Sequence, residues 1–292
     1  MQKPKFSGHQ TFSVRYGWFE KGYQFIKSGH SFTDKDALIV LGVGKNMVTS
    51  IEYWSKLAGF LTEKNKVTEL AEFLLNEDTG RDPYLENDAS WWIIHWNIVT
   101  NPIFYTSGSI LFSKINKQEF TKNDIIESVN GEINKLDKEI SAKIIERDID
   151  CFLHSYCTNT KSKKTKSDYN TLECPMSELH LIEQISSDSY HFNVGMKYSL
   201  PIHVIGYCLW DMVKNKREES INLRDALYDE KSPGQVLLLD ENSLVDAINA
   251  LHEHHLFGEF FELTESAGIS RILCRLKNGF DILEDYYSGG II

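Results

Sequence analysis

Residues 36–61, DALIVLGVGKNMVTSIEYWSKLAGFL, combine a short apolar segment, a turn with two glycines and a longer amphipathic segment. Two helices joined by a short turn that contains glycine form a helix-turn-helix, and Gly42 and Gly44 lie in the turn here. Apolar residues at helical spacing predict a buried face made of Met47, Ile51, Trp54 and Ala58. The opposite face is expected to expose a small, polar and aromatic set that suits a groove: Asn46, Thr49, Ser50, Tyr53 and Lys56.

Composition describes a globular protein with an uneven charge. The chain has 292 residues, 41% of them hydrophobic and 12% aromatic, which is enough for two or three domains with real cores. The net charge is −11, but residues 1–60 carry eight Lys/Arg against four Asp/Glu, or +4. The other 232 residues carry 23 against 38, or −15. This balance argues against nucleic-acid binding over the whole surface and allows a localised contact with DNA.

The cellular compartment follows from what the sequence lacks. It has no run of 18 apolar residues, and its start, MQKPKFSGHQ, has no apolar core of a signal peptide. Five cysteines form an odd number without the short spacing of a disulfide framework. We therefore expect a cytoplasmic protein with no membrane partner.

The pattern of segments predicts a mainly α protein with small β-hairpins, built from tandem winged-helix or helix-turn-helix-like modules. We expect three modules, at residues 1–108, 109–198 and 199–292. The second has a helix over 122–136, capped by Thr121 with Asp124, and a serine-capped helix over 141–152. The third has winged-helix order: helices over 202–214 and 223–228, a strand over 235–239, a helix over 242–255 and a hairpin over 260–276. Acidic residues near its third helix favour a protein partner there.

Several polar residues have two readings. His9, Gln10 and Arg15 either line a polar site or belong to an N-terminal segment that packs on the next module. His95 lies in the apolar stretch SWWIIHWNIV and is expected to be buried and hydrogen-bonded. The lysine-rich stretch Asn159–Asn170 is either a solvated linker or a nucleic-acid arm.

Catalytic motifs are not evident in the sequence. Residues 41–46, LGVGKN, lack the spacing of a phosphate-binding loop, and there is no nucleophile elbow or HExxH motif. The histidines of residues 252–255, HEHH, are expected to interact with a helix C-terminus. Four residues could hold zinc or iron, although free cysteines are often simply buried: Cys151, His154, Cys157 and Cys174.

Six motifs resemble those of a bacterial family catalogued as domain of unknown function 4007. They are FSGHQTF with RYGW, LGVGKNMV with YW, DPYLE, WWIIHW, RDIDCFL and LECPMSELHLI, in this order. The resemblance implies a protein of anti-phage gene clusters, often beside genes for DNA-sulfur modification and for proteins that resemble phosphoadenosine-phosphosulfate reductases. It also implies that Cys151 and Cys174 belong to the family pattern. It supplies no reaction.

We therefore expect a non-enzymatic, cofactor-free accessory protein that binds double-stranded DNA beside other proteins of such a complex. The residues expected to contact DNA are Arg15, Lys45, Asn46, Thr49, Ser50, Tyr53, Lys143 and Arg147. One alternative is an adaptor whose acidic helices bind a partner enzyme. The other is a metal-containing or cysteine-dependent enzyme that uses Cys151 and Cys174, with His9 as an acid or base.

Overall fold

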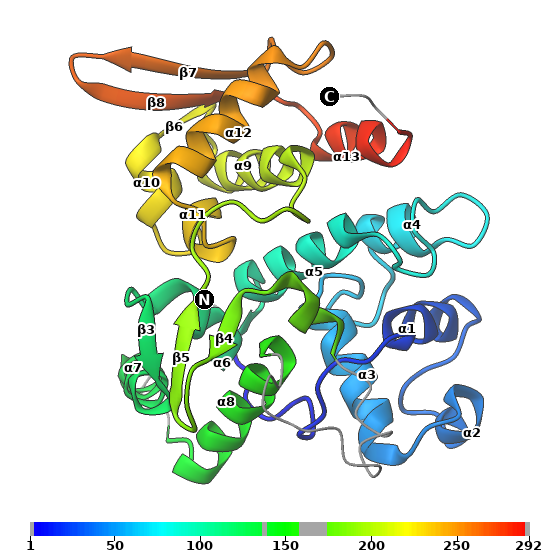
Figure 1. Cartoon of the computed structure of the whole chain (residues 1–292). Helices are drawn as coiled ribbons and strands as arrows, with labels where there is room; N and C mark the ends of the chain where they lie inside the picture. The colour runs from blue at the N-terminus through cyan, green and yellow to red at the C-terminus, as the bar shows by residue number, and fades with distance from the viewer. Residues whose placement is uncertain (1–2, 136–138, 158–173, 290–292) are drawn as a thin grey trace. The chain divides into compact units, whose positions relative to one another are not determined.

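The computed structural model describes residues 3–135, 139–157 and 174–289 of a mainly helical chain with small sheets (Figure 1). The chain forms two compact units, Met1–Asn193 and Val194–Ile292. We expected three modules, divided after residues 108 and 198. Helix α6 (Ser107–Lys114) begins before the first of these positions and packs on helices of the same unit. No helix in the described ranges is long and apolar enough to cross a membrane.

The first half of the first unit contains the two helices predicted over residues 36–61, with Gly42 and Gly44 in the turn between them. Its elements are β1 (Lys3–Pro4), α1 (Trp18–Lys27), α2 (Ala37–Leu41), α3 (Lys45–Leu57), α4 (Glu69–Leu75) and α5 (Asp88–Thr100). Gly42 ends α2 with a φ of 65°, a left-handed conformation that favours glycine. Thr68 caps α4, because its hydroxyl accepts a hydrogen bond from Ala71 N.

Helices α1 and α3 pack closely because α1 carries Gly22 at the contact. A Cβ atom at Gly22 would lie 2.6 Å from Ser55 Oγ and 3.2 Å from Ile51 Cγ2. The first of these distances is shorter than any van der Waals contact. A larger residue at position 22 would therefore push the two helices apart.

Helix α5 lies in the core of the first unit, as its all-round apolar sequence predicts. Trp92 and Trp96 are almost completely buried. The prediction for His95 is confirmed: the side chain is fully buried, and its Nδ1 lies 2.8 Å from the Tyr156 hydroxyl. This hydrogen bond joins α5 to α8 (Ala142–Tyr156).

The second half of the first unit adds a three-stranded antiparallel sheet in the order β3-β5-β4. After β2 (Phe104–Tyr105) and α6 come β3 (Glu119–Thr121), α7 (Lys122–Lys135), α8, the 3-10 helix η2 (Pro175–Leu179), β4 (Ile182–Gln184) and β5 (Ser189–Phe192). The predicted cap at Thr121 is confirmed, since Thr121 and Asp124 exchange side-chain and backbone hydrogen bonds. The lysine-rich stretch Asn159–Asn170 lies outside the described residues.

The second unit repeats this arrangement with a sheet in the order β6-β8-β7. Its elements are α9 (Ile202–Lys216), β6 (Ser220–Asn222), α10 (Leu223–Tyr228), α11 (Pro233–Val236), α12 (Glu241–Glu253), β7 (Phe261–Ser266), β8 (Ile269–Cys274) and α13 (Gly279–Tyr287). The predicted hairpin is confirmed as β7 and β8. The predicted strand over 235–239 is wrong, because Ser232 caps a short helix there and Pro233 occupies its first position. The third strand is β6 instead.

Glu20 on α1 gives the first unit a measurable pH dependence. Burial raises the pKa of this carboxyl from 4.5 to about 7, and the nearby charge of Asp82 raises it further. The native state therefore keeps a proton that the unfolded chain has lost, so stability falls as pH rises from about 4.5 to about 7.

We expect Glu20→Gln to remove this loss and to stabilise the protein at pH 8 by about 1–2 kcal/mol, a value discounted for solvent screening. Chemical denaturation at pH 5 and pH 8 measures the effect, with the exposed Glu77→Gln as the control. An equal effect of Glu20→Gln at both pH values would contradict the assignment.

Candidate nucleic-acid interface

Helix α3 presents only part of its predicted polar face. Lys45, Asn46 and Thr49 are exposed, as expected for the start of a recognition helix. Ser50 and Tyr53 were also expected to face outward, and this is wrong: Ser50 is completely buried and Tyr53 is 4% exposed. The reason is that the loop at residues 7–12 covers this side of α3, so the helix has two buried faces.

Three contacts show how tightly the loop covers α3. The Ser50 hydroxyl lies 2.8 Å from the backbone oxygens of both His9 and Asn46. A Cβ atom at Gly8 would lie 2.2 Å from Cδ2 of the Tyr53 ring, so position 8 accepts only glycine. Trp54 Nε1 also donates a hydrogen bond to Phe12 O at 2.9 Å. The loop is therefore part of the helix-turn-helix core.

The loop is held from its other side by a buried histidine–aspartate pair. His9 Nε2 lies 2.8 Å from Asp148 Oδ1, and both side chains are fully buried. Thr11 N donates to His9 Nδ1 at 3.0 Å, so the ring carries its proton on Nε2 and donates it to Asp148. The backbone N–H groups of Ser7 and Ser107 also donate to this carboxylate. These donors compensate for the cost of burying its charge.

This pair connects α3 to α8, because Asp148 lies on α8 and His9 O accepts the hydrogen bond from Ser50 of α3. The two helices also touch directly: the rings of Trp54 and Phe152 meet edge to face at 5.4 Å. One of our two interpretations was that His9 lines an open polar site. Because His9 has no exposed surface, it does not do so. Its neighbour Gln10 is exposed.

Helix α8 exposes the two basic residues that the sequence singled out, Lys143 and Arg147. The acidic Glu146 is also exposed on this helix, and the half-buried Asp150 is paired with Lys122 Nζ at 2.7 Å. Neither α3 nor α8 has an acidic residue in its first turn, and the N-caps Gly44 and Ser141 make no side-chain cap hydrogen bond. Arg15 is half-buried. Its guanidinium carbon lies 5.6 Å from the centre of the Phe12 ring and 5.7 Å from the centre of the Trp18 ring.

The four candidate metal ligands do not form a cluster in the described residues. Cys151 and Cys174 are buried, Cys157 is half-buried, and His154 is exposed with its Nδ1 on Asp150 O at 2.6 Å. Burial raises the pKa of Cys157 and Cys174 to about 12 and that of Cys151 well above its ordinary value. Raised pKa values keep these thiols protonated at neutral pH, which disfavours a nucleophilic role.

A second polar cluster, which sequence reasoning missed, lies in the second unit: His203, His254 and Asp285. We expected His254 to interact with a helix end together with His252 and His255. His254 does lie at the end of α12, as its C-cap residue, but its side chain is buried. Burial lowers the pKa of His203, and the neighbouring His254 lowers it further. The histidine-rich stretch was a signal, but its partner Asp285 is 31 residues away and only the fold brings it near.

The His9–Asp148 pair predicts a large loss of stability on truncation. His9→Ala and Asp148→Ala should each cost about 3–5 kcal/mol, because each leaves a buried partner without its hydrogen bond. Urea unfolding followed by tryptophan fluorescence reports on this unit, since five of the six tryptophans belong to it. The exposed Thr49→Ala should change stability by less than about 0.5 kcal/mol. Costs that simply add in the double variant would show that the two side chains are not coupled.

Comparisons with known proteins assign the chain to a family and show that its fold is similar to that of two solved structures. A crystal structure of SspB with magnesium bound has 26% sequence identity and a TM-score of 0.87, and the match covers 99% of this chain and 89% of that one. Another SspB crystal structure matches with a TM-score of 0.86 at the same identity and coverage. No curated protein matches. A family model matches residues 6–287, and the chain therefore belongs to the family described as protein of unknown function (DUF4007).

Proposed function

We propose that this protein binds double-stranded DNA as a non-enzymatic accessory component of a DNA-modification or anti-phage system. The observation that supports this most is the pairing of α3 and α8. Both helices begin without acidic residues or side-chain caps, both carry lysine in the first turn, and one buried pair connects them. Helix N-termini with free backbone N–H groups and nearby lysines suit phosphate groups.

The order of elements supports a comparison with winged-helix modules. The elements follow the order α6-β3-α7-α8-β4-β5 in the first unit and α9-β6-α10-α12-β7-β8 in the second. In each sheet the last strand lies in the centre and pairs with both the first and the second strand. In such modules the third helix enters the major groove. That helix is α8 in the first unit, where Lys143 and Arg147 are exposed. In the second unit it is α12, which begins at Asp240 and Glu241 and suits a protein partner instead.

Magnesium has no part in this proposal, although one SspB crystal structure contains it. Magnesium prefers an octahedron of oxygen ligands. The group His203, His254 and Asp285 offers a single carboxylate. A further described group, His30, Asp34 and Asp36, lies at the surface, and Asp34 Oδ2 already accepts a hydrogen bond from Ser31 N at 2.7 Å. Neither group fits a magnesium site.

Salt-dependent binding to a duplex tests the proposal. Each phosphate contact contributes about 0.9 to the slope of log affinity against log salt. The triple variant Lys45→Gln/Lys143→Gln/Arg147→Gln should therefore lower that slope by about 2.7 and weaken binding equally for unrelated sequences. Fluorescence anisotropy with a labelled duplex measures both. Lys277→Gln, an exposed lysine of the second unit, is the matched control. An unchanged slope in the triple variant would refute the interface.

A second candidate function, a protein-interaction adaptor, is favoured by the surface of α2. Leu38, Ile39 and Val40 are 40%, 82% and 49% exposed on consecutive positions of this short helix. A contiguous apolar patch at the surface often marks a protein-binding site. An adaptor of this kind would show no duplex affinity even at low salt, and Ile39→Glu would abolish its complex with a partner. The anisotropy assay therefore separates the two functions.

A further inference from the structure

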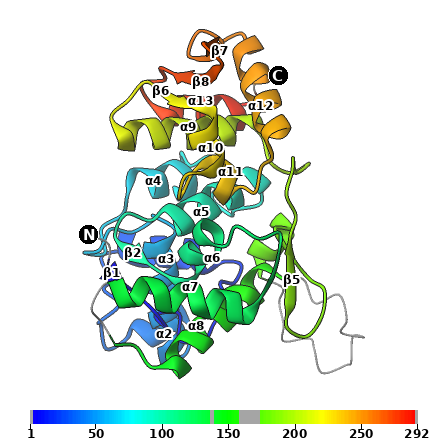
Figure 2. The same ribbon diagram turned by 90° about the vertical axis from the view of Figure 1, so that its left-hand side faces the viewer.

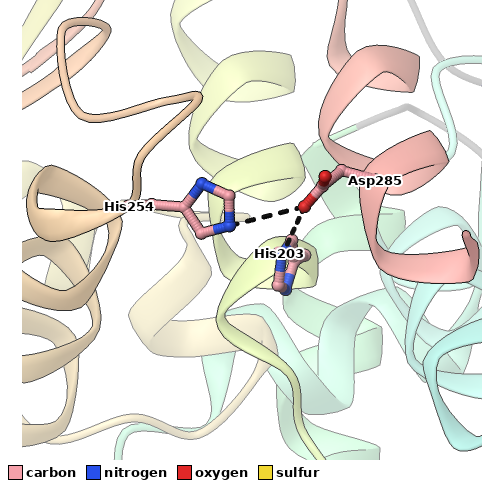
Figure 3. Close-up of side chains that lie close together, drawn as sticks. All are labelled: His203, His254 and Asp285. Carbon is pink, nitrogen blue, oxygen red and sulfur yellow. Dashed lines mark ion pairs between the residues drawn. The ribbon is translucent and has the colours of Figure 1, made fainter. Parts of the chain in front are cut away.

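Three side chains from separate helices of the second unit converge on one point (Figure 3). His203 is the second residue of α9, His254 follows the last residue of α12, and Asp285 lies in the last turns of α13. His203 and His254 are 1% and 5% exposed, and the side chain of Asp285 is 13% exposed. The group therefore lies beneath the surface, where polar atoms need partners.

Nε2 of His203, Nε2 of His254 and Oδ2 of Asp285 face one another and have no hydrogen-bond partner among the described residues. Nε2 of His203 and Nε2 of His254 each lie 3.4 Å from Asp285 Oδ2, as the dashed lines in Figure 3 show. A charge-assisted hydrogen bond from nitrogen to a carboxylate measures about 2.7–2.9 Å. No hydrogen-bond partner is found for these two nitrogens or for Asp285 Oδ2. Buried polar atoms normally have a partner, so these three atoms indicate a bound group between them.

A metal ion accounts for these distances. Zinc binds histidine nitrogen and carboxylate oxygen at about 2.0–2.2 Å with tetrahedral angles, which places two ligand atoms about 3.3–3.5 Å apart. Both nitrogen–oxygen distances here are 3.4 Å, and all three atoms lie within 4.8 Å of one another. Two imidazoles and one carboxylate are ligands that zinc and other divalent transition metals accept and that magnesium does not favour.

We propose that His203, His254 and Asp285 bind one divalent transition-metal ion, for which zinc is the best fit. The described residues supply three ligands to it, so water completes the tetrahedron. The carboxylate neutralises part of the ion's charge. Leu256 N–H lies 3.3 Å from His254 Nδ1. Because a metal on Nε2 leaves the ring proton on Nδ1, that long backbone contact must open when the ion binds.

The ion would act as a cross-link within the second unit. It would join the start of α9, the end of α12 and the C-terminal helix α13, which are distant in sequence. A site that is assembled only in the folded state converts metal affinity into stability. The second unit should therefore unfold at a higher temperature with the metal bound than without it.

Titration of the chelator-treated full-length protein with zinc tests this proposal. We expect one equivalent to bind and the melting temperature to rise. Cobalt(II) should give the visible absorption of a tetrahedral site with nitrogen and oxygen ligands. Asp285→Asn and His254→Gln should each weaken binding at least about tenfold, the change found when metal-site partners are lost. The exposed His255→Gln, next to His254, is the matched control.

The outcomes are distinct. Site-specific loss of binding in Asp285→Asn and His254→Gln, with metal-free melting temperatures close to the parent's, supports the site. If the variants bind zinc as the parent does, or if cobalt shows the thiolate charge-transfer band of a cysteine site, the proposal is overturned. Absence of zinc binding at micromolar concentration in the parent protein overturns it as well. DNA binding is not read out, so this result is independent of the proposed function.

Discussion

A buried carboxylate determines how the first unit is built. The oxygens of the Asp148 carboxyl group lie in a site without solvent and need hydrogen-bond donors, which His9 and the backbone N–H groups of Ser7 and Ser107 supply. Two of these donors, His9 and Ser7, belong to the loop that also accepts the hydrogen bond from Ser50, so Asp148 on α8 helps to fix the position of α3. The hydrogen bonds around Asp148 therefore fix the positions of both helices that carry the exposed Lys45 and Arg147. Figure 2 shows α2, which directly precedes α3, and α8 toward the same end of the first unit.

Local sequence patterns predicted most helices and the β7–β8 hairpin, because helical periodicity and strand-turn signals can each be recognised within a single element. It failed for Ser50 and Tyr53. A stripe assigns one buried face, whereas α3 has a second face covered by a loop about forty residues earlier in the chain. Gly8 was the one residue in the sequence that indicated this contact, because no side chain fits between position 8 and the Tyr53 ring. A glycine alone does not say what it touches.

The metal candidates show the same limit. Cys151, His154 and Cys157 have helical spacing, which suggested a shared face, yet burial and orientation separate them. His203, His254 and Asp285 have no spacing that would connect them, yet three helix ends bring them together. The strand expected over 235–239 failed for a local reason, because the cap by Ser232 and the proline after it start a helix in an apolar run. Local sequence patterns do not show which residues from distant segments the fold brings together.

We propose that α3 and α8 form one DNA-binding surface and that the His9–Asp148 pair holds the two helices together. Amide hydrogen exchange of the full chain, with and without a saturating duplex, tests it most directly because it reads both helices in one experiment. We expect the duplex to slow amide exchange in residues 44–50 and in residues 141–148 together. Protection confined to the second unit, or to only one of these two segments, would contradict it.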